Sequence, residues 1–164
     1  MRPLRPADVP AMAAWLGDYD VAKNTSRVPH PYTEADAEAF LALGPAGNHV
    51  FAIQRRADGL FIGCCGLHPA DEYEFGYWLG KPFWGQGYAT EAAYRLVLYA
   101  FEELGRDSVH AGWFHDNPAS GHVLAKLGAH HDGSHMRESK ARRAAVLCHD
   151  MLLTREAFLS KRAA

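Results

Sequence analysis

A glycine-rich turn directly precedes the most regular helical pattern in this sequence. Gly85 and Gly87 flank a single glutamine, and Ala89 follows, so that small residues alternate through the turn. The first turn of a helix leaves about four backbone N–H groups without intrahelical partners and carries the positive end of the helix dipole. Because glycine has no Cβ, the backbone can come close to a bulky anion. The turn is therefore a candidate phosphate or pyrophosphate site, while a turn without a ligand explains the spacing equally well.

Two familiar nucleotide-binding motifs do not fit this turn. The sequence has no Gly-Lys-Ser/Thr, which excludes a P-loop. A dinucleotide fingerprint would need glycine or alanine at Thr90 and a βαβ unit near the N-terminus. Asp107 lies at the distance of the acidic residue in that fingerprint, but helices and antiparallel strands are expected first. A nucleotide-binding fold is therefore only a remote interpretation.

Histidine and cysteine are the other residue types with obvious chemistry. His130, His131 and His135 lie close together, and metal binding by them is conceivable. No cysteine or second spaced pair accompanies them, so we expect exposed loop histidines and no metal site. An odd number of cysteines without C-x-x-C predicts neither a disulfide framework nor a zinc site. We expect small buried hydrophobic residues at the three positions, which are Cys64, Cys65 and Cys148.

The composition limits the class of protein. The chain has 164 residues, 48% hydrophobic and 22% charged, which fits one globular domain spanning residues 1–164. The net charge of −2 gives no basic excess that would indicate a nucleic-acid partner. No apolar run approaches the roughly 18 to 20 residues that span a bilayer. The N-terminus has no apolar core typical of a signal peptide, and we expect a cytoplasmic protein without a membrane partner.

The first half of the chain predicts two helices followed by three strands. A short edge strand is expected over residues 2–6, and a loop over residues 21–32. The first helix begins at Asp8 and runs to about Leu16. The second begins at Thr33, where Asp36 nearly completes a capping box, and ends near Gly44. Three antiparallel strands follow as a meander over residues 49–56, 60–68 and 73–79.

The second half alternates helices with strands. The helix after the glycine turn has one continuous apolar face over residues 89–104 and ends at Gly105. A strand over residues 108–114 precedes a helix with Asn117 as N-cap, Pro118 at its first position and Gly128 past its end. A long strand over residues 144–154 comes last, and one more strand near Ala129 is left open. This order predicts an α+β domain with a right-handed parallel crossover around residues 89–104.

Three segments, taken together, resemble the GNAT N-acetyltransferase superfamily. They are EFGYWLG, WGQGYATEA and DNPASGHVLAKLG, and they occur in the order and spacing of that family. The resemblance covers the chain from about Leu4 to Phe158 and is closest to the RimJ/RimL-like branch, whose members acetylate protein N-terminal or small-molecule amines. It implies a mixed, mostly antiparallel sheet of six to seven strands with about four helices, splayed at the cofactor site.

The resemblance also implies acetyl-CoA as co-substrate. The family pattern Gln/Arg-x-x-Gly-x-Gly/Ala falls on residues 84–89, and Trp84 replaces the usual Gln or Arg. The pyrophosphate would lie on the backbone amides of the turn, and the pantetheine would pair as an extra strand with the backbone at residues 78–79. Asn117 and Ser120 match the Asn-x-x-Ser of the family. The implied cofactor-binding residues are Trp78, Leu79, Gly85, Gln86, Gly87, Tyr88, Ala89, Thr90, Asn117 and Ser120.

Acetylation of an amine needs a neutral nitrogen, and an alkylamine is mostly protonated at neutral pH, so a general base is useful. Family members often carry a Glu where Glu74 stands, and Glu138 is the rival candidate in the MRES segment. Ser120 is a candidate ligand or general acid. Many members place a tyrosine four residues beyond that serine, where this chain has Leu124. Ser120, Tyr77 or a water is therefore the expected source of the proton for the leaving thiolate.

Three further points stay open at the level of sequence. The amine should bind near the loop 24–32, with Trp15 and the Glu138 segment opposite, and His30 and His115 are weaker cleft candidates. The replacement at Leu124 favours an alternative function, a non-catalytic acyl-CoA-binding regulatory module. The final strand and the aromatic-rich strands would suit a homodimer interface, and a core explains the same residues.

Overall fold

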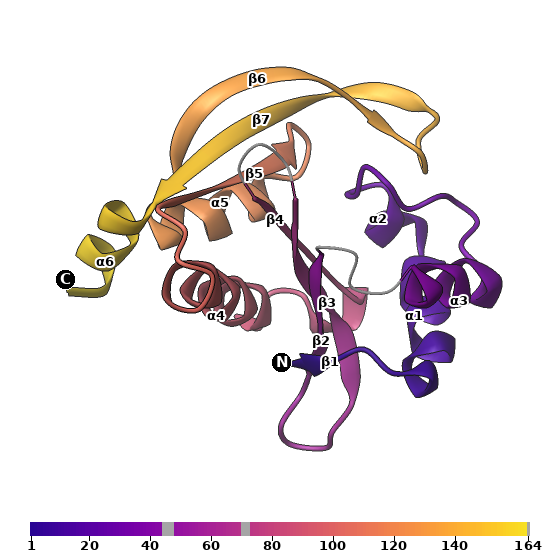
Figure 1. The fold of residues 1–164 in the computed structure, drawn as a ribbon. Coiled ribbons are helices and arrows are strands. Elements are labelled where there is room, and N and C mark those ends of the chain that lie inside the picture. Colours follow the sequence, from indigo (N-terminus) through magenta and orange to yellow (C-terminus); the bar gives the residue numbers. More distant parts are fainter. Residues whose placement is uncertain (44–47, 70–72, 164) are drawn as a thin grey trace.

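The computed structural model describes residues 1–43, 48–69 and 73–163. Their seven strands form one sheet in the order β1-β2-β3-β4-β5-β7-β6 (Figure 1). The strands are β1 (Arg2–Pro3), β2 (His49–Gln54), β3 (Phe61–His68), β4 (Glu74–Leu79), β5 (Ser108–Phe114), β6 (His130–Ser139) and β7 (Ala144–Thr154). The helices are η1 (Pro6–Asp8), α1 (Val9–Leu16), α2 (Tyr19–Ala22), α3 (Glu34–Ala42), η2 (Lys81–Phe83), α4 (Tyr88–Glu102), α5 (Pro118–Leu127) and α6 (Arg155–Ala163). None of the helices in these residues is long and apolar enough to cross a membrane.

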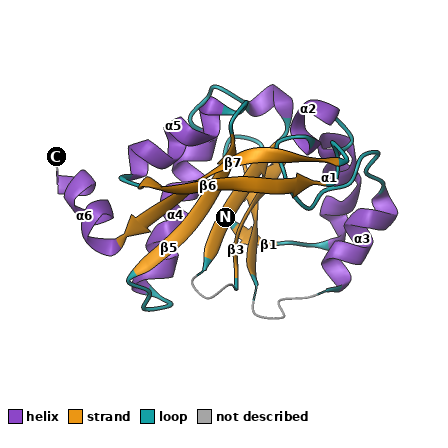
Figure 2. Ribbon diagram, turned by 90° about the horizontal axis from the view of Figure 1, so that it is seen from above, coloured by secondary structure: helices purple, strands orange, loops and turns teal. Residues whose placement is uncertain are grey.

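Helices cover both faces of the sheet. Figures 1 and 2 show α4 and α5 on one face and α1, α2 and α3 on the other. The larger core lies under α4, whose buried residues recur at helical spacing from Ala92 to Phe101, as the sequence predicted. A smaller core around Met12, Ala52 and Phe61 lies under α1 and α3. The mixed α+β fold predicted from the sequence is confirmed.

The predicted meander is confirmed, since β2, β3 and β4 pair antiparallel in sequence order. The predicted capping of α3 is confirmed as well: the Thr33 hydroxyl accepts from the Asp36 amide, and the Asp36 carboxylate accepts from the Thr33 amide. The cap expected at Asp8 was wrong in detail, because its carboxylate instead accepts two bonds from Arg2 at 2.8 and 2.6 Å. Ionic pairing of this buried carboxylate replaces the cap.

Two helices were not predicted, so the described residues hold six α-helices rather than about four. Helix α2 lies partly in the predicted loop 21–32; it is one turn long, with Asp18 accepting from the Asp20 amide. A single turn is too short to show a helical period. Helix α6 follows the last strand directly and buries Phe158 in the larger core. One buried side chain does not make a periodic pattern.

The histidines expected in a loop lie on a strand. His130, His131 and His135 are exposed, as predicted, but they belong to β6, which also contains Glu138. Strand β6 is a sheet edge that pairs only with β7 among the described strands. Most of its residues are exposed on both faces, so the alternation that marks a half-buried strand is absent. The three cysteines are buried and free, as expected.

The sheet opens between β4 and β5. These strands run parallel, as predicted for the crossover through α4, and in the described residues their register is limited to Glu74 opposite His110. The neighbouring pair β3–β4, in contrast, is in continuous register from Gly63–Leu79 to His68–Glu74. The backbone edges of β4 and β5 beyond Glu74 therefore diverge, which is the splay expected from the sequence.

Candidate active site

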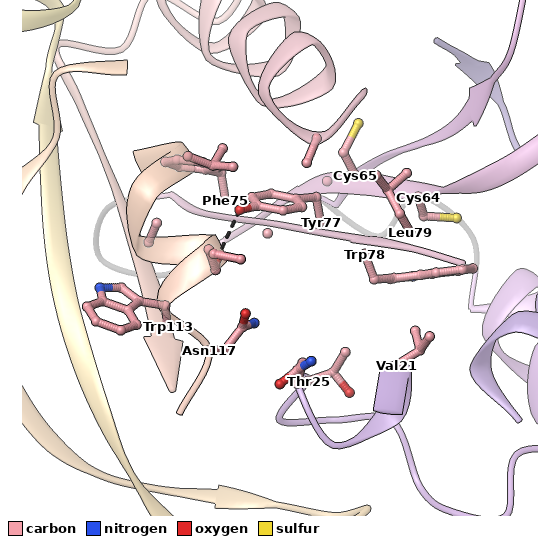
Figure 3. A pocket seen from close by; sticks show the side chains of 18 of the residues that line it. Val21, Thr25, Cys64, Cys65, Phe75, Tyr77, Trp78, Leu79, Trp113 and Asn117 are labelled. Atoms are coloured by element: carbon pink, nitrogen blue, oxygen red, sulfur yellow. Dashed lines mark hydrogen bonds between the residues drawn. The ribbon is translucent and has the colours of Figure 1, made fainter. Parts of the chain in front are cut away.

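The gap between β4 and β5 opens into a cavity of about 610 Å³ (Figure 3). Successive side chains of a strand point to opposite faces, so β4 divides the cavity into two halves. Tyr77 and Leu79 belong to the face covered by α4 and α5, which we call the α4–α5 half. Glu74 and Trp78 belong to the face covered by α1 to α3, which we call the α1–α3 half.

The glycine turn opens into the α4–α5 half. Gly85 and Gly87 have φ values of 72° and 84°, a conformation that favours glycine. A Cβ added at either residue would have no heavy atom within 4 Å, so the space in front of the turn is open. Gly87 is the N-cap of α4, and no side chain bonds the first amides of that helix. The side chain of Gln86 is directed away, donating to the Pro82 carbonyl at 2.8 Å. The exposed amides are thus available to an anion.

Trp84 fastens this turn to the end of β4. Its indole N–H donates to the Leu79 carbonyl at 2.8 Å, while the residue keeps 41% of its surface exposed. The Leu79 carbonyl was among the backbone groups expected to pair with a ligand, and it is already engaged. The tryptophan that departs from the family pattern therefore has a structural role at the cavity mouth.

Helix α5 contributes polar groups from the other wall of the α4–α5 half. Asn117 occupies the N-cap position, but its side chain makes no capping bond and lies in the cavity (Figure 3). Ser120, in the first turn, lies 3.0 Å from the Tyr77 hydroxyl (dashed in Figure 3). Burial raises the pKa of Tyr77 to about 12, so this phenol stays protonated. Leu124 is 1% exposed and belongs to the core. The sequence left three proton sources open. Two of them, Ser120 and Tyr77, form one hydrogen-bonded pair.

Glu74 lines the α1–α3 half, but its carboxylate is not isolated. Oε1 accepts from Arg137 Nη1, and Oε2 lies 3.9 Å from Arg27 Nη2. Arg137 also approaches Asp150, at 3.7 Å between Nη2 and Oδ1. Glu138 is exposed and is not among the lining residues, because Arg137 precedes it on β6 and adjacent strand residues point to opposite faces. The structure brings Glu74 to the cavity and leaves Glu138 outside it.

His68 is a cavity residue that the sequence reasoning missed. It lies opposite Glu74 in the β3–β4 register, and its Nδ1 is 3.0 Å from the Asn48 side-chain oxygen. Because an amide oxygen only accepts, this contact suits a His68 ring that carries a hydrogen on Nδ1. Burial, reinforced by the Arg27 guanidinium, lowers the pKa of His68 below its usual range. No spacing in the sequence indicates this residue, because its place follows from strand register.

This electrostatic arrangement gives a prediction that does not depend on activity. Removing the positive charge in Arg27→Gln should raise the pKa of His68, because a nearby cation disfavours the imidazolium form. Titration of the imidazole proton signals by NMR measures the shift. Arg56→Gln is the matched control, since Arg56 is exposed and does not line the cavity. An unchanged His68 titration in Arg27→Gln would contradict this placement of Arg27.

The loop expected to bind an amine is tied to the tip of the β6–β7 hairpin. The Lys140 amide donates to the Ser26 carbonyl at 3.0 Å, and the Ser139 hydroxyl donates to the Thr25 carbonyl at 3.2 Å. These bonds hold residues 24–28 along the α1–α3 half. In Figure 1 the tip of the β6–β7 hairpin lies on the same side of the molecule as α2. The other sequence candidates for this side, Trp15, His30 and His115, are not among the described lining residues.

Comparisons with known proteins agree with this geometry. A model of the acetyltransferase (GNAT) domain matches residues 1–130. FsC-acetyl coenzyme A-N(2)-transacetylase of Aspergillus fumigatus is 40% identical over 86 residues, which cover 46% of this chain and 37% of that protein. The chain thus spans well under half the length of this relative.

Two solved structures share the fold. A GNAT-family acetyltransferase from Bacillus anthracis has a TM-score of 0.83 at 22% identity and covers 94% of this chain and 93% of its own. Spermidine N-acetyltransferase from Vibrio cholerae, in complex with CoA and spermine, has a TM-score of 0.82 at 16% identity and covers 96% of each chain. At these identities the likeness concerns the fold alone.

Proposed function

We propose an acetyl-transfer function from one premise: this chain belongs to the acetyltransferase (GNAT) domain family, whose model matches residues 1–130. In this function the protein is an acetyl-CoA-dependent N-acetyltransferase that acetylates a primary amine in a ternary complex. The observation that carries the proposal is the cavity in the β4–β5 splay, which joins the open glycine turn to the Tyr77–Ser120 pair and to Glu74.

Acetyl-CoA fits the α4–α5 half. The open space before Gly85 and Gly87 and the uncapped start of α4 suit its pyrophosphate. The divergent edge of β4 suits its extended pantetheine arm, by strand addition. When bound, acetyl-CoA supplies the acetyl group through its thioester, whose C–S bond breaks as the amine forms a C–N bond. The residues proposed to hold it are Trp78, Leu79, Gly85, Gln86, Gly87, Tyr88, Ala89, Thr90, Asn117 and Ser120.

Glu74 is the proposed acceptor of the amine proton, directly or through a water. It is the carboxylate that the structure brings to the α1–α3 half among the described residues, and Arg137 fixes its position. A base must lie within hydrogen-bond reach of the proton that it removes, and Glu138 does not meet this requirement from the outer face of β6. The proposal therefore gives Glu138 no catalytic role.

Tyr77 and Ser120 are the proposed proton source for the leaving thiolate. The pair faces the α4–α5 half from β4 and α5, on the two sides of the splay. The raised pKa keeps the Tyr77 hydroxyl a hydrogen-bond donor throughout the working pH range. A protonated phenol that shares a hydrogen bond with a serine can pass a proton through that hydroxyl. This arrangement would take over the role of the tyrosine that family members place at the position of Leu124.

The second candidate function is a non-catalytic acyl-CoA-binding regulatory module, favoured by the buried Leu124. Both functions predict acetyl-CoA binding, and only transfer to an amine separates them. Within the enzyme function, the RimJ/RimL-like resemblance points to protein N-terminal or small-molecule amines, and the cofactor-binding residues do not distinguish between these acceptors.

The test is calorimetric titration of the purified protein with acetyl-CoA, followed by detection of released CoA thiol with two panels of acceptors. One panel contains peptides with free N-termini, and the other contains small amines, including polyamines and amino acids. We expect binding of acetyl-CoA and turnover of at least one acceptor. Binding without turnover would favour the regulatory module, and absence of binding would contradict both functions.

A further inference from the structure

The α1–α3 half contains an ion pair with room between its partners. Arg27 Nη2 and Glu74 Oε2 are 3.9 Å apart, beyond direct hydrogen-bonding distance. The Arg27 side chain keeps 65% of its surface exposed, and within the described residues Glu74 is its only ion-pair partner. Both side chains line the cavity. A positive and a negative group thus face the same space without satisfying each other.

Arg137 keeps Glu74 in this position. Its guanidinium bonds the other oxygen of Glu74 and approaches Asp150 on β7. The arginine lies over Gly112 on β5, where an added Cβ would meet Arg137 Nη1 at 3.4 Å and Cys148 Sγ at 2.9 Å. An added Cβ would thus clash with Cys148 Sγ and would reach Arg137 only at ordinary contact distance, so the absence of a side chain at Gly112 leaves room for both groups. Arg137 is held by two carboxylates. Arg27 is therefore the more available of the two arginines for binding an anionic group of a substrate.

The charges of this half suit a zwitterion better than a polycation. An α-amino acid carries its ammonium and its carboxylate on one carbon, so the two groups can bind Glu74 and Arg27 at once. A polyamine would bring several cations next to Arg27 and Arg137, with Glu74 the one acidic residue among the described lining residues. The N-terminus of a peptide has an ammonium but no adjacent carboxylate.

The rest of this half combines polar residues, Asn24, Thr25, Ser26 and His68, with a group of apolar side chains. The apolar side chains come from α1, α2, α3, β4 and the loops between the helices. They are Leu16, Val21, Val28, Tyr32, Phe40 and Trp78. An apolar side chain on the acceptor would bury its surface against these side chains, and burial of apolar surface stabilises a complex.

We propose that the acceptor is an α-amino acid with an apolar side chain, whose ammonium binds Glu74 and whose carboxylate binds Arg27. This assignment rests on the acetyl transfer proposed above and names its substrate class. In this geometry the proton of the ammonium passes to Glu74 as the nitrogen becomes the nucleophile. The product is an N-acetyl amino acid that keeps its carboxylate on Arg27.

The experiment compares matched acceptors with wild-type protein: L-leucine and L-phenylalanine, their amides, and spermidine. The amides lack the carboxylate, and their amines are the weaker bases, so a larger share of them is neutral and ready to react. We expect kcat/KM for the amino acids to exceed that for the amides by about tenfold, typical of an exposed charge-assisted hydrogen bond. A preference for the amides or spermidine would overturn the proposal while leaving acetyl transfer intact.

The matching variant is Arg27→Gln, which should lose about tenfold in kcat/KM for the amino acids, mainly through KM, with little change for the amides. Arg56→Gln, at an exposed position outside the cavity, should change neither. An equal loss for amino acids and amides in Arg27→Gln would contradict a carboxylate contact.

Direct binding of products separates failure of this inference from failure of the proposed function. N-acetyl-L-leucine and its amide are titrated calorimetrically into CoA-saturated protein, wild type and Arg27→Gln. We expect wild-type protein to bind N-acetyl-L-leucine about tenfold more tightly than its amide, and Arg27→Gln to bind the two equally. If this pattern appears while no acceptor is acetylated, the carboxylate site stands and the transfer function fails. If acceptors are acetylated and the acid and amide bind equally, the inference fails and the transfer function stands.

Discussion

Gly87→Glu is expected to weaken acetyl-CoA binding by at least about 100-fold, equivalent to about 2.7 kcal/mol. The substitution has two physical effects, of which the first lowers stability and the second lowers affinity. Gly87 has a φ of 84°, and a non-glycine residue in the left-handed region costs about 1–2 kcal/mol. The glutamate carboxylate would also lie in the open space before α4, where the proposed pyrophosphate needs the uncapped amides. Calorimetric titration measures the change in Kd.

Gly105→Glu is a close control for this variant. Gly105 has a φ of 65°, and an added Cβ there also has no heavy atom within 4 Å. The substitution therefore introduces similar backbone strain and the same charge, at a residue that does not line the cavity. We expect comparable destabilisation of both variants in thermal unfolding, with loss of acetyl-CoA binding in Gly87→Glu alone. Wild-type affinity in a folded Gly87→Glu protein would rule out the turn as the pyrophosphate site.

Tyr77→Phe is expected to lower kcat by about 100-fold while leaving the Kd for acetyl-CoA nearly unchanged, in line with the removal of a general acid or its donor. Phenylalanine keeps the buried ring and removes only the hydroxyl that lies 3.0 Å from Ser120. Because burial raises the pKa of Tyr77 to about 12, the hydroxyl is protonated at both pH 7 and pH 9. The factor lost should therefore be the same at the two pH values, as measured by single-turnover kinetics.

Ser120→Ala and the double variant complete this experiment. If Tyr77 acts through Ser120, the two losses are not additive, because either substitution interrupts the same path. Tyr94→Phe is the control, since it removes a phenol from α4 at a residue packed on Phe158 and outside the cavity. Small effects of both Tyr77→Phe and Ser120→Ala on kcat would assign protonation of the thiolate to water, the remaining source considered from the sequence.

Much of the site on the α4–α5 half could be predicted, because it depends on contiguous residues. The glycine turn, the apolar face of α4 and the N-cap position of Asn117 each occupy a few consecutive residues. Local backbone preferences and helical period act over that range, so the sequence indicates them directly. The meander of β2, β3 and β4 follows for the same reason, since short connections favour antiparallel neighbours.

The elements that the sequence missed, α2 and α6, and the strand near Ala129 that it left open, which is β6, carry weak local patterns. Strand β6 is exposed on both faces, α2 is a single turn, and α6 buries one residue in the larger core. Such elements form because a neighbour stabilises them: β6 pairs along β7, and its hairpin tip bonds the loop at Thr25 and Ser26. The sequence named Glu138 as the rival base and left a strand near Ala129 open, but it did not indicate the pleat of that strand, which directs Arg137, rather than Glu138, into the cavity.

The sequence by itself determined the family resemblance, the turn before α4 and the residue types available for chemistry. Only the tertiary structure decided which of them meet. Tyr77 and Ser120 are 43 residues apart and Glu74 and Arg137 are 63 apart, yet each pair is in hydrogen-bond contact. His68 reaches Glu74 through strand register alone. Such pairings depend on how the sheet splays and how its strands align, and these properties arise from packing over the whole domain rather than from any local stretch of residues.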